Sequence, residues 1–182
     1  MAIKTFTTGE VLTASDTHTY LANSGLVYVT SATVGTGVSS VTISNCFSTT
    51  YDNYRVVING VGASASLGLL ARMGAAATGY YGNFTYVLYS GTSYTFVPMN
   101  NATSWYIALS DSSSPSVATS FDVMQPFLSA RTFYTGGYYG RGYTGNFGGA
   151  LENSNSYTSL VLIPESGTLT GGTVTVYGYR KA

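Results

Sequence analysis

The residues that could support catalysis are few and far apart in the sequence. Beyond the N-terminal region the acidic residues considered are Asp52, Asp111, Asp122, Glu152 and Glu165. Glycoside hydrolysis requires two carboxyl groups held several ångströms apart across a cleft. Glu152 and Glu165 flank one predicted strand and could pair, although acids at such positions more often lie in solvated turns. We therefore expect no catalytic pair of acids.

The residues that bind metals or act as nucleophiles are also scarce, since His18 is the sole histidine and Cys46 the sole cysteine. An intrachain disulfide and a multi-cysteine or multi-histidine metal site are thereby excluded. We expect His18 to lie on the surface of a short helix rather than to act as a general base. Cys46 should be a small buried hydrophobic residue. With no G-x-S-x-G or phosphate-binding loop, the sequence predicts no enzymatic activity, no metal and no cofactor.

A glycine- and aromatic-rich segment offers binding chemistry instead. Residues 133–149 contain seven glycines and six aromatic residues, and residues 79–84 repeat the pattern more weakly. Tyrosine provides rigid contact area with a polar tip, and aromatic rings can stack on the faces of sugars. The glycines favour a surface loop. The candidate receptor contacts are Tyr138, Tyr139, Arg141, Tyr143 and Phe147, followed by Tyr80 and Tyr81. The alternative is a Gly/Tyr hairpin that packs against a neighbouring subunit.

The charge content limits the classes of partner. Only 8% of the 182 residues are charged and the formal net charge is zero, whereas soluble domains carry about 25% charged residues. Nucleic-acid binding is disfavoured because it depends on clustered Lys and Arg. No polybasic anchor is present, and no apolar run approaches the ~18 residues of a membrane span. The N-terminus also lacks the apolar region of a signal peptide.

Low charge combined with 26 aromatic residues leaves more apolar surface than one domain of this size is expected to hide. We therefore expect an obligate oligomer or a part of a larger particle. The aromatic residues considered for positions at or near subunit boundaries are Tyr28, Phe47, Tyr54, Trp105, Tyr177 and Tyr179.

From residue 26 onward, short segments rich in β-branched and aromatic residues alternate with turn signals. Period-two alternation is typical of strands with one buried and one solvated face. The predicted strands are 27–29, 38–47, 54–61, 67–73, 84–89, 105–109, 117–124, 157–163 and 174–179. The sequence therefore predicts an all-β fold, an antiparallel β-sandwich of the jelly-roll or Greek-key kind, formed by residues 31–182.

Residues 1–30 have a different character and are predicted to form a separate attachment segment. Thr13 or Ser15 can cap a short helix over residues 16–23, and Gly25 can end it. The apolar side chains in this segment need a partner surface, either the domain that follows or a neighbouring subunit. The candidate anchor residues are Val11, Leu12, Tyr20, Leu21 and Leu26.

Three stretches of the sequence carry a family resemblance. The run from Lys4 to Leu21, which contains GEVLTASD and TYL, is similar to the N-terminal segment of small virion structural proteins of tailed bacteriophages. The stretch 47–54 and the ending 171–180 resemble segments that recur in the same proteins, whereas residues 75–160 match none of them. The resemblance implies a homotrimeric fibre or decoration protein of the virion that is assembled in the bacterial cytoplasm. It carries over no catalytic residue.

The preferred hypothesis is a short trimeric tail fibre that binds other virion proteins through its N-terminal segment and contacts a host surface glycan or protein. The alternative within the class is a capsid decoration protein, which would be present in hundreds of copies per particle. A free carbohydrate-binding module would not need an apolar N-terminal anchor. A polysaccharide-degrading enzyme should show acids converging in a cleft.

Overall fold

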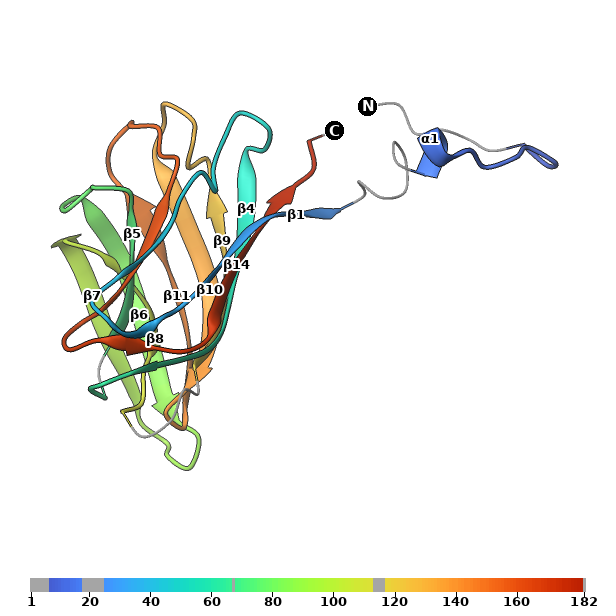
Figure 1. Ribbon diagram of the computed structural model, residues 1–182. Coiled ribbons are helices and arrows are strands. Elements are labelled where there is room, and N and C mark those ends of the chain that lie inside the picture. Colours follow the sequence, from blue (N-terminus) through green and yellow to red (C-terminus); the bar gives the residue numbers. More distant parts are fainter. Residues whose placement is uncertain (1–6, 18–24, 67, 113–116, 182) are drawn as a thin grey trace.

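The alternating segments pair into antiparallel strands that stack as two sheets, which confirms the all-β prediction (Figure 1). The computed structural model describes residues 7–17, 25–66, 68–112 and 117–181. The elements are α1 (Ala14–Asp16), β1 (Leu26–Thr33), β2 (Thr36–Val38), β3 (Val41–Ile43), β4 (Asn53–Ala63), β5 (Gly68–Met73), β6 (Tyr80–Leu88), β7 (Tyr94–Ala102), β8 (Trp105–Leu109), β9 (Val117–Met124), β10 (Thr132–Gly140), β11 (Tyr143–Leu151), β12 (Leu160–Pro164), β13 (Leu169–Thr170) and β14 (Thr173–Tyr179).

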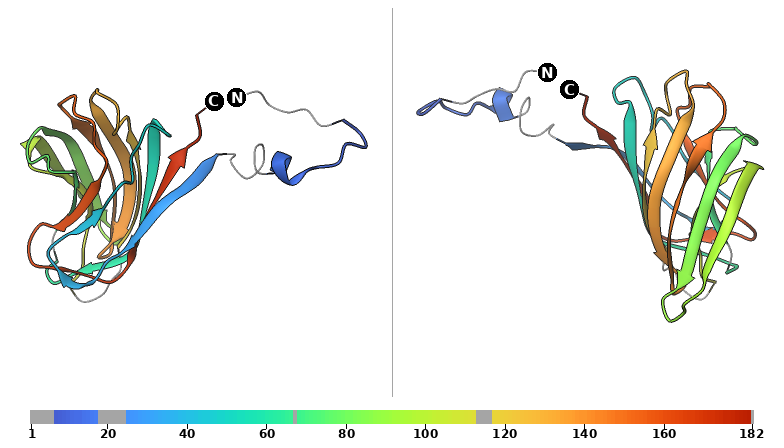
Figure 2. Two further views of the ribbon diagram at one scale, coloured as in Figure 1. Left: turned by 45° about the horizontal axis from the view of Figure 1, so that its top comes forward. Right: turned by 180° about the vertical axis from the view of Figure 1, so that it is seen from behind.

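The larger sheet has the order β1-β14-β4-β9-β10-β11-β6-β7, and the short strands β13 and β2 continue from β4. The smaller sheet has the order β3-β12-β5-β8. Strand β14, the last in the sequence, pairs with both β1 and β4, so the two ends of the domain meet within one sheet. The right-hand view of Figure 2 shows the strands of the larger sheet in front of the smaller one.

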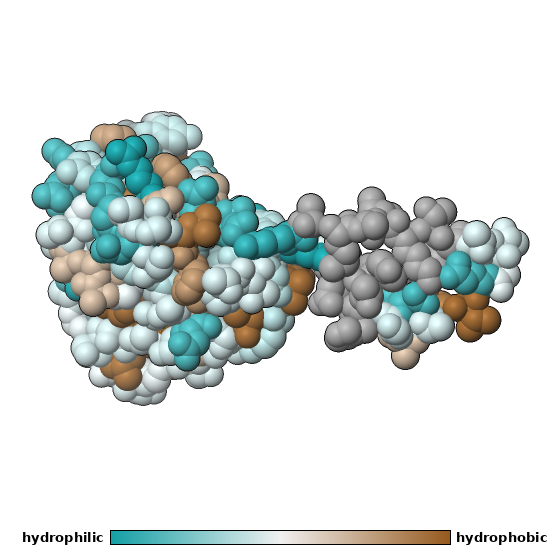
Figure 3. Space-filling view, turned by 90° about the horizontal axis from the view of Figure 1, so that it is seen from above, coloured by the Kyte–Doolittle hydropathy of each residue, from teal (hydrophilic) through white to brown (hydrophobic). Residues whose placement is uncertain are grey.

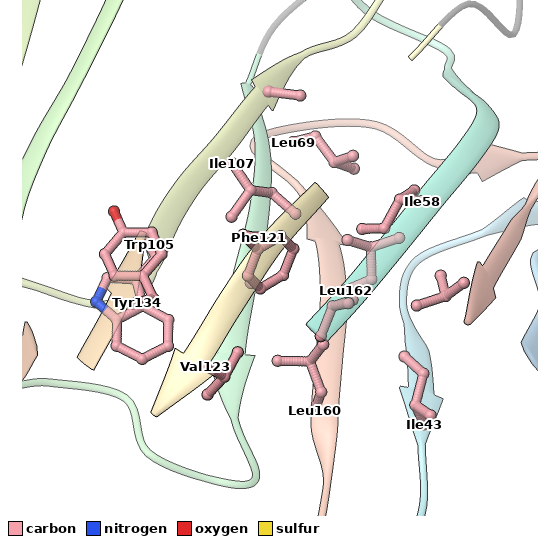
Figure 4. Packing of buried hydrophobic residues seen from close by; sticks show 14 of the residues in the cluster. Ile43, Ile58, Leu69, Trp105, Ile107, Phe121, Val123, Tyr134, Leu160 and Leu162 are labelled. Atoms are coloured by element: carbon pink, nitrogen blue, oxygen red, sulfur yellow. The ribbon is translucent and has the colours of Figure 1, made fainter. Parts of the chain in front are cut away.

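The core lies between the sheets and combines aliphatic side chains with large aromatic rings (Figure 4). Trp105 stacks on Tyr134 with ring centroids 4.2 Å apart and meets the edge of Tyr80 at 5.1 Å. Phe121 and Phe147 extend this cluster from the neighbouring strands β9 and β11. Because all five rings are buried, each contributes on the order of 2 kcal/mol of hydrophobic stabilisation. The ring contacts of Trp105, which lies on β8, therefore pack the smaller sheet against the inner face of the larger one.

The glycine-rich segment 133–149 is regular structure, which corrects the predicted surface loop. Strands β10 and β11 form a nine-pair hairpin closed by Arg141 and Gly142. Both turn residues have positive φ, 54° and 72°, as a tight hairpin turn whose twist matches its strands requires. The glycines allow close strand approach: a Cβ on Gly149 would collide with the backbone of β6 at Tyr81 and Gly82.

The N-terminal segment contains only a short stretch of described helix, α1. Thr13 caps it, since its hydroxyl accepts a hydrogen bond from Asp16 N while the Asp16 side chain accepts one from Thr13 N. This confirms Thr13 as a cap of the kind predicted. The remainder of the predicted helix, residues 18–23, lies outside the described residues. Residues 7–17 stand apart from the sandwich (Figure 2), and apolar surface is exposed on them (Figure 3).

Candidate functional site

The larger sheet leaves one face uncovered by any other element of the described chain. We call this the open face; it carries the side chains that point away from the smaller sheet. Strand register places its side chains in rows across the sheet. One row is Tyr177, Arg55, Asp122, Thr135, Gly148 and Asn83, and the next is Thr175, Val57, Ser120, Gly137, Asn146 and Thr85. Residues far apart in the sequence thus become neighbours.

The middle of the open face is hollowed because small residues occupy its central strands. A depression of about 450 Å³ lies over β4, β9, β10 and β11, and its lining includes Arg55, Ser120, Asp122, Thr135, Gly137 and Asn146. The side chains of Ser120, Thr135 and Asn146 are exposed and form no hydrogen bond among the described residues. Their hydroxyl and amide groups are therefore available to a ligand.

One wall of the depression is a fixed ionic network. Arg55 donates one hydrogen bond to each carboxylate oxygen of Asp122, from Nε at 2.8 Å and from Nη2 at 2.9 Å. The Tyr179 hydroxyl donates to the same carboxylate at 2.7 Å. Burial alone would raise the pKa of Asp122, but the hydrogen bonds from Arg55 and Tyr179 outweigh it and lower that pKa. Asp122 is therefore a charged, oriented acceptor.

Aromatic side chains border the depression. Phe133 and Tyr139 lie on the open face of β10, 40% and 51% exposed. They flank Thr135 and Gly137, and the six residue steps of extended strand from one to the other span about 20 Å. Tyr81 lies in the same row as Phe133, because Ala150 pairs with both. Phe96 and Tyr94 on the edge strand β7 are more exposed still. The open face thus has a polar centre and an aromatic border.

Three of the predicted receptor contacts lie in the core instead. Tyr138, Phe147 and Tyr80 are at most 5% exposed, so the expectation that they lie on a surface loop is wrong. Strand alternation explains the result, because Tyr138 and Tyr139 are adjacent in β10 and must point to opposite faces. Of the predicted set, Tyr139 and Tyr81 are the members that lie on the open face.

Arg141 and Tyr143 lie at a different place, the side opening between the two sheets. They help to line a hollow of about 250 Å³ with Tyr106 and Glu165. Tyr106 donates to Glu165 at 2.6 Å, and Gly68 N donates to the other carboxylate oxygen at 2.8 Å. Burial and the bond to Glu165 raise the pKa of Tyr106. The Arg141 guanidinium lies 5.8 Å from the ring centre of Tyr143 and donates to the Ser66 carbonyl at 2.8 Å. This hydrogen bond joins the β10–β11 turn to the loop that follows β4.

The residues considered for subunit boundaries also divide between core and surface. Phe47, Tyr54 and Trp105 are at most 2% exposed, which makes them core residues and excludes them from a boundary. Tyr28, Tyr177 and Tyr179 lie on the open face near the sheet edge. Their place in a trimer stays a prediction.

Of the anchor candidates, Val11 and Leu12 are 78% and 48% exposed and Leu26 is 42% exposed. Tyr20 and Leu21 lie outside the described residues. Glu152 pairs with Arg131 at 2.8 Å, whereas Glu165 bonds to Tyr106, so these two acids are not partners of each other in the structure.

Sequence reasoning treated Asp122 only as an isolated acid and did not consider Arg55, Thr135 or Asn146. The available signal was the two-residue spacing of polar side chains, which place Asn53 and Arg55 on one face of β4, Ser120 and Asp122 on one face of β9, and Thr144 and Asn146 on one face of β11. Which of these polar residues share a row depends on strand order, and alternation does not reveal that order.

The described residues contain no group of three or more metal-ligating side chains and no helix able to cross a membrane. Cys46 is fully buried, and burial raises its pKa to about 12. Its thiol is therefore a protonated packing group, which confirms the expectation for this residue.

Comparison with known proteins gave no match in any of three searches. No family model, no curated protein and no solved structure matches the chain.

Proposed function

We propose that this protein is a virion structural protein of a tailed bacteriophage, a short trimeric tail fibre attached through residues 1–30, with the open face of its sandwich turned toward the host surface. The observation that carries the proposal is the N-terminal segment: its described residues stand apart from the sandwich and expose Val11 and Leu12. Exposed apolar side chains on a separate segment are typical of a docking element that becomes buried on a partner.

The sandwich supports the proposal in a second way. A fibre protein needs a rigid body that holds its contact face in place, and the aromatic core supplies it. The resemblance of the N-terminal run to phage virion proteins points to the same class. Capsid decoration remains the alternative, in which the open face would bind capsid subunits rather than the host.

Deleting residues 1–24 tests the attachment role. The deletion keeps Gly25, whose carbonyl accepts a hydrogen bond from Arg180 N. We expect the truncated chain to fold with an unchanged melting temperature, to keep the trimer mass in light scattering, and to be absent from purified particles. A matched variant carries Val11→Ser with Leu12→Ser, and its control is Tyr89→Ser at another strongly exposed position.

Failure of the truncated chain to fold would show that the segment belongs to the core and would overturn the proposal. A monomer mass for the full chain in light scattering at micromolar concentration would contradict the proposed trimer. Quantitative mass spectrometry of particles separates the two virion roles, because a fibre occurs in a few copies and a decoration protein in hundreds.

A further inference from the structure

We propose that the open face is a binding site for an uncharged polysaccharide, which lies over the central depression and contacts the rings of Phe133 and Tyr139. This inference deepens the host-contact role proposed above and rests on it. It assigns the contact to a sheet face and specifies the ligand as a neutral glycan.

The distribution of polar and apolar groups favours a glycan over a second protein. Protein–protein interfaces have an apolar centre surrounded by a polar rim. The open face has the opposite arrangement, with Ser120, Thr135 and Asn146 at its centre and Phe133 and Tyr139 at its border. A second copy of the chain would leave these central polar groups dehydrated without matched partners, which is costly.

The chemistry of the central groups matches sugar hydroxyls. Hydroxyl and amide side chains both donate and accept hydrogen bonds, as sugar hydroxyls do. Asp122 adds a fixed acceptor, because Arg55 and Tyr179 hold its carboxylate in one orientation. Pre-oriented polar groups beside apolar walls are the general design of small-molecule sites. The rings supply the apolar contact for the faces of the sugar units.

The charge balance of the face argues for a neutral ligand. In strands β4, β6, β9, β10 and β11 the charged side chains are Arg55 and Asp122 alone, and these neutralise each other. An anionic polymer would require unpaired cationic side chains along its path. The site offers none on these strands.

A glycan array tests the inference with the full chain. The probes are oligomers of glucose, galactose, mannose and N-acetylglucosamine, with polygalacturonate as the anionic comparison. We expect binding to at least one neutral series and none to polygalacturonate. Gly137→Val should reduce that binding tenfold or more, because a Cβ there enters the depression and its nearest contact is Asn146 Oδ1 at 3.2 Å, the movable end of a side chain. Thr42→Val, at an exposed position on β3 of the smaller sheet, is the control and should bind as the unaltered chain does.

Two ring variants keep the test decisive if Gly137→Val folds poorly. Phe133→Ala and Tyr139→Ala remove exposed rings and should each weaken binding about fivefold, as expected for the loss of roughly 1 kcal/mol of ring contact. Absence of binding to every neutral series overturns the inference, and so does unchanged binding in both ring variants. A lower oligomer mass in these variants would instead identify the open face as a subunit interface.

The outcomes separate this inference from the proposed function. Neutral-glycan binding by a chain that never enters particles leaves the site in place and removes the virion role. Incorporation into particles by a chain that binds no neutral glycan would support the virion role and overturn the glycan site.

Discussion

The two faces of the hairpin β10–β11 carry the same types of aromatic residue in opposite environments, one buried and one exposed to solvent. On the inner face Tyr134, Tyr138 and Phe147 are close-packed and nearly inaccessible to solvent. On the open face Phe133 and Tyr139 stand in solvent, with small polar residues between them. The comparison shows that an aromatic and glycine-rich composition does not by itself indicate a loop or a site. The face on which each ring lies decides its role.

The largest expected difference between the faces is in stability. Trp105→Ala should lower the free energy of unfolding by about 3–5 kcal/mol, because it leaves a cavity beside Tyr134 and Tyr80. Tyr139→Ala should change it by no more than about 0.5 kcal/mol, since that ring is half exposed. Urea unfolding of the two variants measures both quantities. Comparable losses would contradict the division into a packed and an exposed face.

A smaller effect should separate two tyrosines within the core. The Tyr80 hydroxyl accepts from Met73 N at 2.8 Å and donates to the Ala76 carbonyl at 3.0 Å, and burial raises its pKa to about 12. The Tyr138 hydroxyl is buried with no hydrogen-bond partner among the described residues. Tyr80→Phe should therefore destabilise the fold by about 1–3 kcal/mol, whereas Tyr138→Phe should leave stability unchanged or raise it.

Thermal unfolding of the two phenylalanine variants measures this contrast, and each is the control for the other because the same atom is removed. An equal loss from Tyr138→Phe would mean that its hydroxyl has a partner, such as a bound water, in solution.

The smallest expected effect comes from the ionic network of the open face. The pKa of Asp122 is lowered on folding, so its contribution to stability is present above the ordinary carboxyl pKa of about 4 and is lost as the pH falls through the lower folded value. Arg55 is 40% exposed in its side chain, which limits the contribution to at most about 1 kcal/mol. Unfolding of Asp122→Asn against the unaltered chain between pH 2 and 7 should show the difference shrink toward acid pH. A difference that grows toward acid pH would contradict the network.

The fold was more accessible to sequence reasoning than the site. Strands β8 and β9 were predicted with their observed bounds, because β8 is a short run of aromatic and aliphatic residues and β9 alternates between buried and more exposed positions. β7 was missed, since Pro98 and the following asparagines disfavour a strand; its place at the sheet edge explains why the proline is tolerated. β10 and β11 were missed because their glycines weaken strand propensity, although the glycines are what allow these strands to approach β6 closely.

The site could be predicted only in part, for a physical reason. Alternation indicates which residues share a face of one strand, so Tyr139 could have been separated from Tyr138. It does not indicate which strands become neighbours. Arg55 and Asp122 are 67 positions apart in the sequence and meet only because β4 and β9 pair in the middle of the sheet.

The pairing of β1 with β14 has a mechanical consequence. The chain leaves the sandwich toward its N-terminal segment at Leu26, and β1 contacts its sheet through β14 alone in the order of strands. If the segment tethers the protein, tension enters along the length of β1, whose N-terminal end extends from the sandwich toward that segment (Figure 1). The hydrogen bonds to β14 from Leu26 to Thr33 then carry the load together, in shear, rather than opening one at a time. An edge strand separates easily when force breaks its hydrogen bonds one after another. Force applied along β1 from its N-terminal end instead acts on all of these bonds at once.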